Sequence, residues 1–190
     1  MTDIRADVWF ANIVWQANLT IDNSKLKQRA DELRLYTDSV KLSNQMGWQS
    51  KSMSPDDSTL SEFKTVLDEA VSKCTESVAL PDLKFYNMWF NINPQYSYNT
   101  LHNHQDSILS GVYYVDVPDN NMGNIEFHRD DDMQYYMPAL KNYNQFTSQK
   151  AVYKPQTGML LLFPSWLKHQ VMQNQSTKDR YSISFNYGVK

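Results

Sequence analysis

Residues 158–171, GMLLLFPSWLKHQV, carry the plainest fold signal of the chain. The apolar run at 159–163 has the length of a buried strand, and the Pro-Ser-Trp sequence at 164–166 predicts a turn after it. A second predicted strand, 169–172, follows this turn. Two short strands on either side of a turn favour a β-structure in this part of the chain.

The same pattern of short strands continues on both sides of this stretch. Segments rich in β-branched and aromatic residues, several alternating apolar with polar, are separated by Asn, Asp, Gly and Pro. Residues 130–149 show no period and predict a long loop, which in a compact domain is more often functional than idle. The further predicted strands are residues 83–92, 108–117, 123–128, 151–154 and 180–187.

The first third of the chain has a different character. A strand is expected at 8–17, and apolar residues spaced near the helical period predict helices at 22–40 and 58–78. Each helix begins beside Asp, Asn or Ser residues that can cap it. The segment between the helices, 43–53, is irregular, with a turn at Gly47.

Helices followed by a run of strands predict the α+β class. The expected architecture is a sandwich or barrel with the N-terminal helices packed on one sheet. The 190 residues suit a single domain, 1–190, with a helical framework at 1–82 and the β core at 83–190.

Bulk properties exclude several classes of protein. A net charge of −3 gives no electrostatic case for a nucleic-acid partner. The single cysteine, Cys74, excludes an internal disulfide and a cysteine-based zinc site. No signal peptide is visible, and no run approaches the roughly 20 apolar residues of a membrane span. We therefore expect a cytoplasmic protein with no membrane partner.

The four histidines supply the candidate chemistry. They are His102, His104, His128 and His169. In an extended chain residues i and i+2 point the same way, so either His102 with His104, or His104 with Asp106, can face one point. Arg180 follows His169 by eleven residues, and Ser182 lies on the same strand face as Arg180.

This order of residue types suits an oxygen-activating iron site. Non-haem ferrous sites use histidines, often with one carboxylate, on one face of an octahedron and leave positions open for other ligands. A 2-oxoglutarate cosubstrate needs a cation for its far carboxylate, and arginine offers a planar fork to which a serine hydroxyl can add a bond. H-x-H or H-x-D, then a distal histidine, then R-x-S is an ordered set for that purpose.

Each piece has an ordinary structural interpretation when taken alone. His102 and His104 can be solvated loop residues, His169 can be a strand-edge residue, and Arg180 can pair with Asp179 or another carboxylate. His128 is interpreted as a surface or pocket-rim residue. The tryptophans at 48, 89 and 166 are expected in the core, although Trp48 can also line a substrate pocket.

Several longer pieces resemble a family of 2-oxoglutarate/Fe(II) oxygenases found in marine bacteria and their phages. The similarity runs from about residue 43 to residue 187, and its most specific parts are H-x-H followed by SGVYY, and FPSWLxH followed by RxSxSFN. The pieces are SNQMGWQS (43–50), MWFN (88–91), YNTLHNHQDSILSGVYYV (98–115), GNIEF (123–127), GMLLLFPSWLKHQV (158–171) and RYSISFNY (180–187).

The resemblance implies a double-stranded β-helix, related to jelly rolls and cupins, with Fe(II) and 2-oxoglutarate as cofactor and cosubstrate. It implies His169 as the distal metal ligand and Arg180 as the cosubstrate anchor, helped by Ser182 and Tyr114. For the other ligands the family pattern favours H-x-H, His102 and His104. The wider superfamily uses H-x-D, which makes Asp106 the rival of His102.

The expected function is therefore an Fe(II)- and 2-oxoglutarate-dependent oxygenase that hydroxylates an unidentified small molecule or peptide. If a phage encodes the chain, the location is the host cytoplasm. One alternative is a cupin-like sugar-binding or isomerase domain, which would use H-x-H but would not need Arg180. Another is a non-enzymatic module on the same fold.

Overall fold

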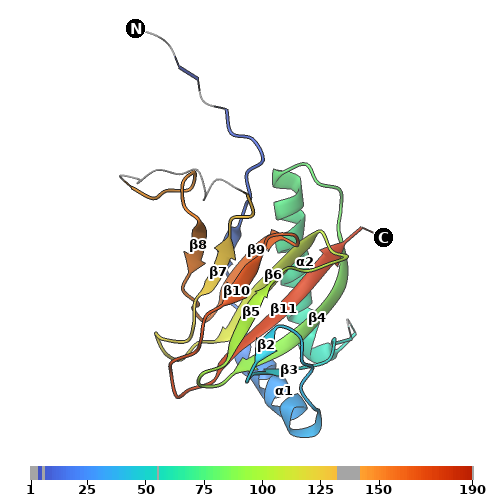
Figure 1. The fold of residues 1–190 in the computed structure, drawn as a ribbon. Helices are drawn as coiled ribbons and strands as arrows, with labels where there is room; N and C mark the ends of the chain where they lie inside the picture. Colours follow the sequence, from blue (N-terminus) through green and yellow to red (C-terminus); the bar gives the residue numbers. More distant parts are fainter. Residues whose placement is uncertain (1–3, 6, 55, 132–141, 190) are drawn as a thin grey trace.

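A computed structural model describes residues 4–5, 7–54, 56–131 and 142–189, and its strands form two antiparallel sheets (Figure 1). The six-stranded sheet has the order β1 (Trp15–Asn18), β9 (Met159–Pro164), β6 (Leu109–Asp116), β11 (Arg180–Gly188), β4 (Lys84–Asn93) and β3 (Trp48–Gln49). The five-stranded sheet has the order β2 (Asn44–Gln45), β5 (Tyr98–His102), β10 (His169–Val171), β7 (Ile125–His128) and β8 (Lys150–Tyr153).

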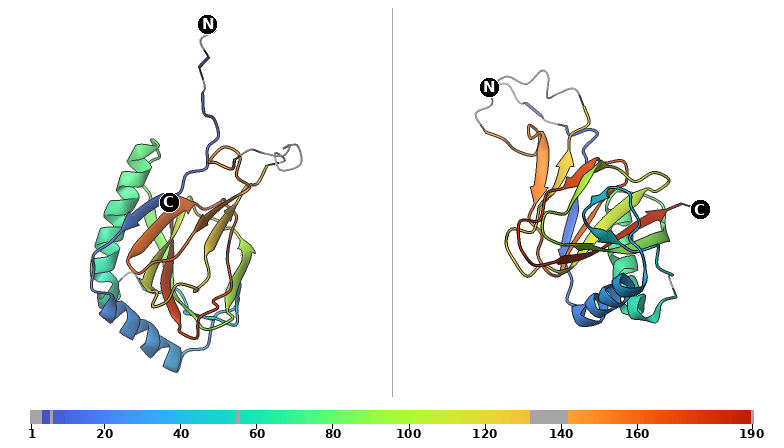
Figure 2. Two further views of the ribbon diagram at one scale, coloured as in Figure 1. Left: turned by 90° about the vertical axis from the view of Figure 1, so that its left-hand side faces the viewer. Right: turned by 60° about the horizontal axis from the view of Figure 1, so that its bottom comes forward.

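Two helices cover the outer face of the six-stranded sheet. They are α1 (Asn23–Tyr36) and α2 (Ser61–Ser77), the latter preceded by the short 3-10 helix η1 (Ser58–Leu60). Figure 2 shows them along one side of the strands. The arrangement confirms the predicted sandwich with helices packed on one sheet.

Side-chain alternation along the strands produces two apolar layers. On β11, Ile183 and Phe185 point outward into the layer that the helices cover, together with Phe63 and Leu67 of α2. The second layer lies between the two sheets, and its buried members are Val112, Tyr114, Ile125, Phe127, Met159, Leu161, Phe163 and Leu167. The outer layer fixes the six-stranded sheet, and the inner layer fills only part of the space between the sheets.

Tyrosine hydroxyls tie the sheet to the helices. Tyr181 of β11 donates a hydrogen bond to Asp31 of α1 at 2.8 Å, and Tyr187 donates to Asp68 of α2. These bonds satisfy polar atoms at the edge of an apolar layer, where an unpaired hydroxyl would be destabilising. The helices are thereby held on the face of β11 that points away from the inner cavity.

Several predicted boundaries were wrong. The first strand is only Trp15–Asn18. The first helix ends at Tyr36 because the backbone of Thr37 is extended, with φ −133° and ψ 141°, and the Thr37 hydroxyl bonds to the Leu33 carbonyl in the last turn. The segment 43–53 contains β2 and β3, joined through Met46, which has a positive φ of 59°. The strand β5 was not predicted.

The long segment 130–149 is described only in part. Its residues 132–141 lie outside the described residues, and the described remainder before β8 contains no helix or strand. Among the helices that the structure describes, none combines the length and the apolar character that crossing a membrane requires.

Candidate metal centre

A cavity of about 520 Å³ opens between the sheets. The inward-facing side chains of β4 and β11 form one wall, and the ends of β5 and β10 contribute to another. None of the described residues that line it is an aspartate or a glutamate, and its two permanent cations are Arg180 and Lys51. The described lining therefore carries positive charge and no negative charge.

Three histidines converge on this cavity. His102 ends β5, His104 follows two residues later, and His169 begins β10 directly opposite His102 in the antiparallel register. One ring nitrogen from each lies within 4.8 Å of the others. The His102 and His169 ring centroids are 4.3 Å apart, and those of His104 and His169 are 5.2 Å apart. This spacing allows the three imidazoles to hold one metal ion.

Hydrogen bonds hold the Nδ1 atom of every ring in this cluster. His102 Nδ1 lies 2.7 Å from the Thr100 carbonyl, and His169 Nδ1 lies 2.9 Å from the Leu167 carbonyl. His104 Nδ1 lies 2.5 Å from Asn186 Oδ1. Because each partner is an acceptor, Nδ1 carries the proton in all three rings and the lone pair of Nε2 is available to a metal.

Burial keeps these rings uncharged. Desolvation lowers the pKa of His102, and it lowers the pKa of His104 to about 4, with the nearby His102 adding to the effect. The pKa of His169 also falls well below its ordinary value because that ring is buried beside the other two. Neutral imidazole is the form that binds metals, so near pH 7 the three rings are in the protonation state that a metal ion requires.

Asp106 takes no part in the cluster. It is exposed, lies in a turn and has a positive φ of 61°. Because β5 ends at His102, the alternation of an extended strand does not continue to Asp106, and the cavity lining does not include it. The structure thus brings together the H-x-H set and not the H-x-D set.

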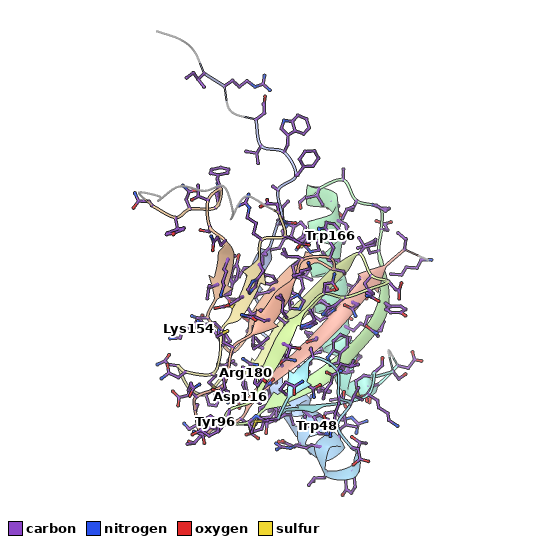
Figure 3. All side chains as sticks on the ribbon, in the orientation of Figure 1. Trp48, Tyr96, Asp116, Lys154, Trp166 and Arg180 are labelled. Carbon is purple, nitrogen blue, oxygen red and sulfur yellow. The ribbon has the colours of Figure 1, made fainter. Side chains whose placement is uncertain are left out.

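Arg180 is a buried cation in the same cavity. It is 2% exposed, and its Nη1 donates to the Met122 and Gly123 carbonyls at 2.7 and 2.8 Å, while its Nε has no hydrogen-bond partner. Within the described chain no carboxylate pairs with it. Figure 3 places Arg180 at the end of the strands away from Trp166.

The expected alternative partner of Arg180 is engaged elsewhere. Asp179 forms its ion pair with Arg34 of α1, at 2.7 Å. A buried guanidinium with an unsatisfied N–H and no counter-anion is unfavourable unless an anion joins it. The carboxylate of a cosubstrate fits that requirement.

Tyr114 and Ser182 line the cavity with Arg180. The guanidinium carbon lies 5.9 Å from the centre of the Tyr114 ring. Burial raises the pKa of Tyr114 to about 12, so its hydroxyl stays protonated and can donate a hydrogen bond. Ser182 is buried and shares the inward face of β11 with Arg180. All seven candidate residues except Asp106 therefore line one cavity.

The remaining candidates lie elsewhere. His128 is half-buried on β7, with Nε2 3.7 Å from the Glu126 carboxylate, and it does not line the cavity. Of its two expected places, the surface or the pocket rim, only the first is compatible with this position. Burial raises the pKa of Cys74 to about 11, in keeping with its structural role on α2. Trp48 is buried and donates to the Thr37 carbonyl.

Two tryptophans differ from the expectation of a core role. Trp166 is 57% exposed, and Trp89 lines the cavity with its ring 5.8 Å from that of His104. Asn87 and Asn186 also line the cavity and were missed. The alternation that predicts one face for Arg180 and Ser182 also places Asn186 on that face, so the sequence could have indicated Asn186 as a lining residue.

Several solved structures have a fold similar to that of this chain. A structure of the Pseudomonas putida prolyl-4-hydroxylase is similar with a TM-score of 0.66 and 13% identity, covering 93% of this chain and 92% of that one. A Trichoplax adhaerens prolyl hydroxylase, solved with a hypoxia inducible factor peptide, gives a TM-score of 0.70 and 13% identity over 92% and 83% of the two chains.

A third similar structure is HygX from Streptomyces hygroscopicus with nickel and 2-oxoglutarate bound, with a TM-score of 0.63 and 14% identity over 92% and 82%. At these identities the structures show the fold, which is the double-stranded β-helix. No curated protein sequence matches the chain. The family model described as "Putative 2OG-Fe(II) oxygenase" matches residues 87–186, more than half of the chain. The chain therefore belongs to this family of oxygenases, whose cofactor is Fe(II) and whose cosubstrate is 2-oxoglutarate.

Proposed function

We propose that His102, His104 and His169 bind Fe(II) through Nε2, that Arg180 anchors 2-oxoglutarate, and that the protein hydroxylates an unidentified substrate. The observation that carries this proposal is that one cavity holds both a cluster of possible metal ligands and a buried cation without a counter-anion. Three neutral imidazoles have their Nδ1 atoms held and their Nε2 atoms within reach of one ion. A buried guanidinium in the same cavity has no anion.

Iron and 2-oxoglutarate, when bound, supply the oxidation of a substrate C–H bond with release of succinate and carbon dioxide. The protein supplies position. Arg180 would bind the far carboxylate, with the hydroxyls of Tyr114 and Ser182 beside it in the lining. The apolar side chains of the inner layer keep water away from the guanidinium, which strengthens its attraction for a carboxylate.

The cavity is of a size that takes a small molecule or a single peptide side chain. The prolyl hydroxylases among the similar structures do not decide between these. We include a cytoplasmic location in the proposal, in a phage host if a phage encodes the chain, because a reducing compartment keeps iron ferrous. Nucleic acid and membranes stay excluded as partners in this proposal.

The test is release of succinate from 2-oxoglutarate by purified protein given Fe(II) and oxygen. Uncoupled turnover that His169→Ala abolishes is the expected result, because loss of one of three protein ligands removes most of the metal affinity. A protein that binds a sugar but releases no succinate would instead be the cupin-like alternative. The buried position of Arg180 argues against that alternative, which has no use for such a cation.

A further inference from the structure

Asn186 contacts three side chains of the site at once. It lies on the inward face of β11 and is 6% exposed. Its Oδ1 accepts from the Ser110 hydroxyl at 2.7 Å and from His104 Nδ1 at 2.5 Å. Its Nδ2 donates to Asn87 Oδ1 at 2.8 Å. Both ends of the amide are thus used, and one of them is used by a cluster histidine.

In the structure the amide of Asn186 turns its oxygen toward His104 and its nitrogen toward Asn87. One end of an Asn amide only accepts hydrogen bonds and the other only donates them. With Asn87 Oδ1 against Nδ2, Oδ1 of Asn186 is left for His104 and the Ser110 hydroxyl. In the reversed orientation Nδ2 would donate to His104 Nδ1, the ring proton would move to Nε2, and Nε2 would have no lone pair for a metal.

His104 differs from the other two histidines in this respect. His102 and His169 use the backbone carbonyls of Thr100 and Leu167, which are acceptors in any orientation. His104 relies on a side chain that can rotate. Its ligand form therefore depends on residues outside the cluster, on β11 and β4.

We infer that Asn186 is a positioning residue for the metal centre, oriented by Asn87, that holds His104 in the Nδ1–H form with Nε2 toward the metal. The inference rests on the proposed function, because it assigns a role relative to the same three ligands. It states that metal binding needs more than the three ligands, because it also needs a side chain at position 186 that accepts a hydrogen bond.

The experiment is a Co(II) titration of metal-free protein, followed through the visible absorption bands of the bound ion. Asn186→Leu removes the acceptor at similar volume, and the affinity should fall by about ten- to a hundred-fold, with altered bands. Asn186→Asp keeps an acceptor for the ring N–H, and Asn87 can turn its own amide to donate. Its affinity should stay within about threefold of wild type or rise, since a carboxylate partner makes the ring a stronger ligand.

Asn91→Leu is the matched control. Asn91 lies on the inward face of the neighbouring strand β4, is buried, and donates to Ser184 Oγ at 3.0 Å rather than to a histidine. Its Co(II) affinity should equal that of wild type. If Asn186→Leu does not fold, Asn87→Leu replaces it, since that variant removes only the acceptor that orients the amide, and weaker binding is again expected.

Two outcomes overturn the inference alone. One is wild-type affinity in Asn186→Leu, or in Asn87→Leu where that replaces it. The other is equal weakening by Asn186→Leu and Asn186→Asp, which would mean that position 186 matters for packing and not as an acceptor. By contrast, wild-type protein that binds no Co(II), or binds it equally well after His169→Ala, would overturn the proposed metal centre.

Discussion

At the scale of single residues, Arg180 is the buried side chain whose hydrogen bonding most clearly calls for a further partner. A cation that is 2% exposed and bonded only to two carbonyls keeps an N–H unsatisfied. Such a group is destabilising in the free protein and becomes favourable when a carboxylate arrives. Under the proposed function, part of the affinity for 2-oxoglutarate would therefore come from pairing this one cation.

We predict that Arg180→Met weakens 2-oxoglutarate binding by about ten- to a hundred-fold. The lost charge-assisted bonds amount to roughly 1.5–3 kcal/mol, and each ~1.4 kcal/mol is a factor of ten. Isothermal titration of the Co(II)-loaded protein with 2-oxoglutarate measures this. Co(II) affinity itself should stay unchanged, because Arg180 is not a ligand. Lysine should restore binding only in part, since it lacks the planar fork.

Arg34→Met serves as the control for Arg180, because Arg34 pairs with Asp179 at the surface and does not line the cavity. Its 2-oxoglutarate affinity should match that of wild type. Unchanged affinity in a folded Arg180→Met protein would show that the anchor lies elsewhere.

The ligand register gives a second prediction for single residues. His102→Ala should reduce Co(II) affinity by at least a hundred-fold, because it removes one of three protein ligands. Asp106→Asn should leave the affinity within about twofold of wild type. Asn is chosen because it tolerates the left-handed backbone at this position, where φ is 61°. If His102→Ala had a small effect on Co(II) affinity and Asp106→Asn a large one, His104 and Asp106 would be the ligands instead of His102 and His104.

Among the elements, β11 shows why much of the site was predictable. Its alternation sends every second residue, from Arg180 to Asn186, toward the cavity. The residues that point into the helix-covered layer instead are Tyr181, Ile183 and Phe185. A period of two is visible in sequence, so the face shared by Arg180 and Ser182 could be predicted without coordinates. The hydrogen bond from His104 to Asn186 could not, because it joins a loop residue to a strand residue 82 positions later in the chain, and only tertiary packing brings the two together.

The strand β5 shows why other elements were not predictable. Its sequence, Tyr98–His102, has no apolar alternation. All five of its residues are exposed or half-buried, and none belongs to either apolar layer. It is a strand because β2 and β10 pair with it on either side. The tiny strands β2 and β3 likewise depend on partners distant in sequence. Pairing of this kind leaves no local pattern.

Close packing between strands gives a prediction at the same scale. A Cβ at Gly111 of β6 would lie 2.4 Å from the Phe185 ring and 2.6 Å from the Leu161 carbonyl. Gly111→Ala should therefore destabilise the protein by about 1–3 kcal/mol, as overpacking of a core does. Urea denaturation measures it. Gly188→Ala is the matched control, since its Cβ would meet only the Asp106 carbonyl at 3.8 Å. Equal stability of the two variants would contradict the close approach.

At the scale of the whole molecule, the two apolar layers have different roles. The helices and the outer face of the six-stranded sheet form a continuous core that holds β4 and β11 in place. The inner layer fills one part of the space between the sheets, and the rest is the cavity that the three histidines and Arg180 line. The larger core stabilises the fold independently of the cavity. The protein can therefore bury three uncharged histidines and an unpaired arginine there.

This arrangement predicts how stability depends on pH. In the folded, metal-free protein the pKa values of His102, His104 and His169 lie below the ordinary value near 6.5, that of His104 at about 4. In the unfolded chain the same groups titrate near 6.5. Above pH 6.5 they are neutral in both states and do not affect stability. Below it the unfolded chain takes up protons that the folded protein refuses, so the free energy of unfolding falls as the pH falls.

We predict that the free energy of unfolding of metal-free wild type falls faster between pH 7 and pH 5 than that of His104→Asn, by about 1–2 kcal/mol. Each pKa unit is worth about 1.36 kcal/mol, and this window spans about 1.5 units below the unfolded-state value. Urea denaturation at pH 7, 6 and 5 measures both proteins. With Co(II) in fixed excess the wild-type curve should be higher at pH 7 and steeper, because the metal binds only the folded, deprotonated histidines and protons compete with it. Parallel curves for the two proteins without metal would show that His104 is not a buried neutral residue, and the metal site would then lack the form of the ring that it requires.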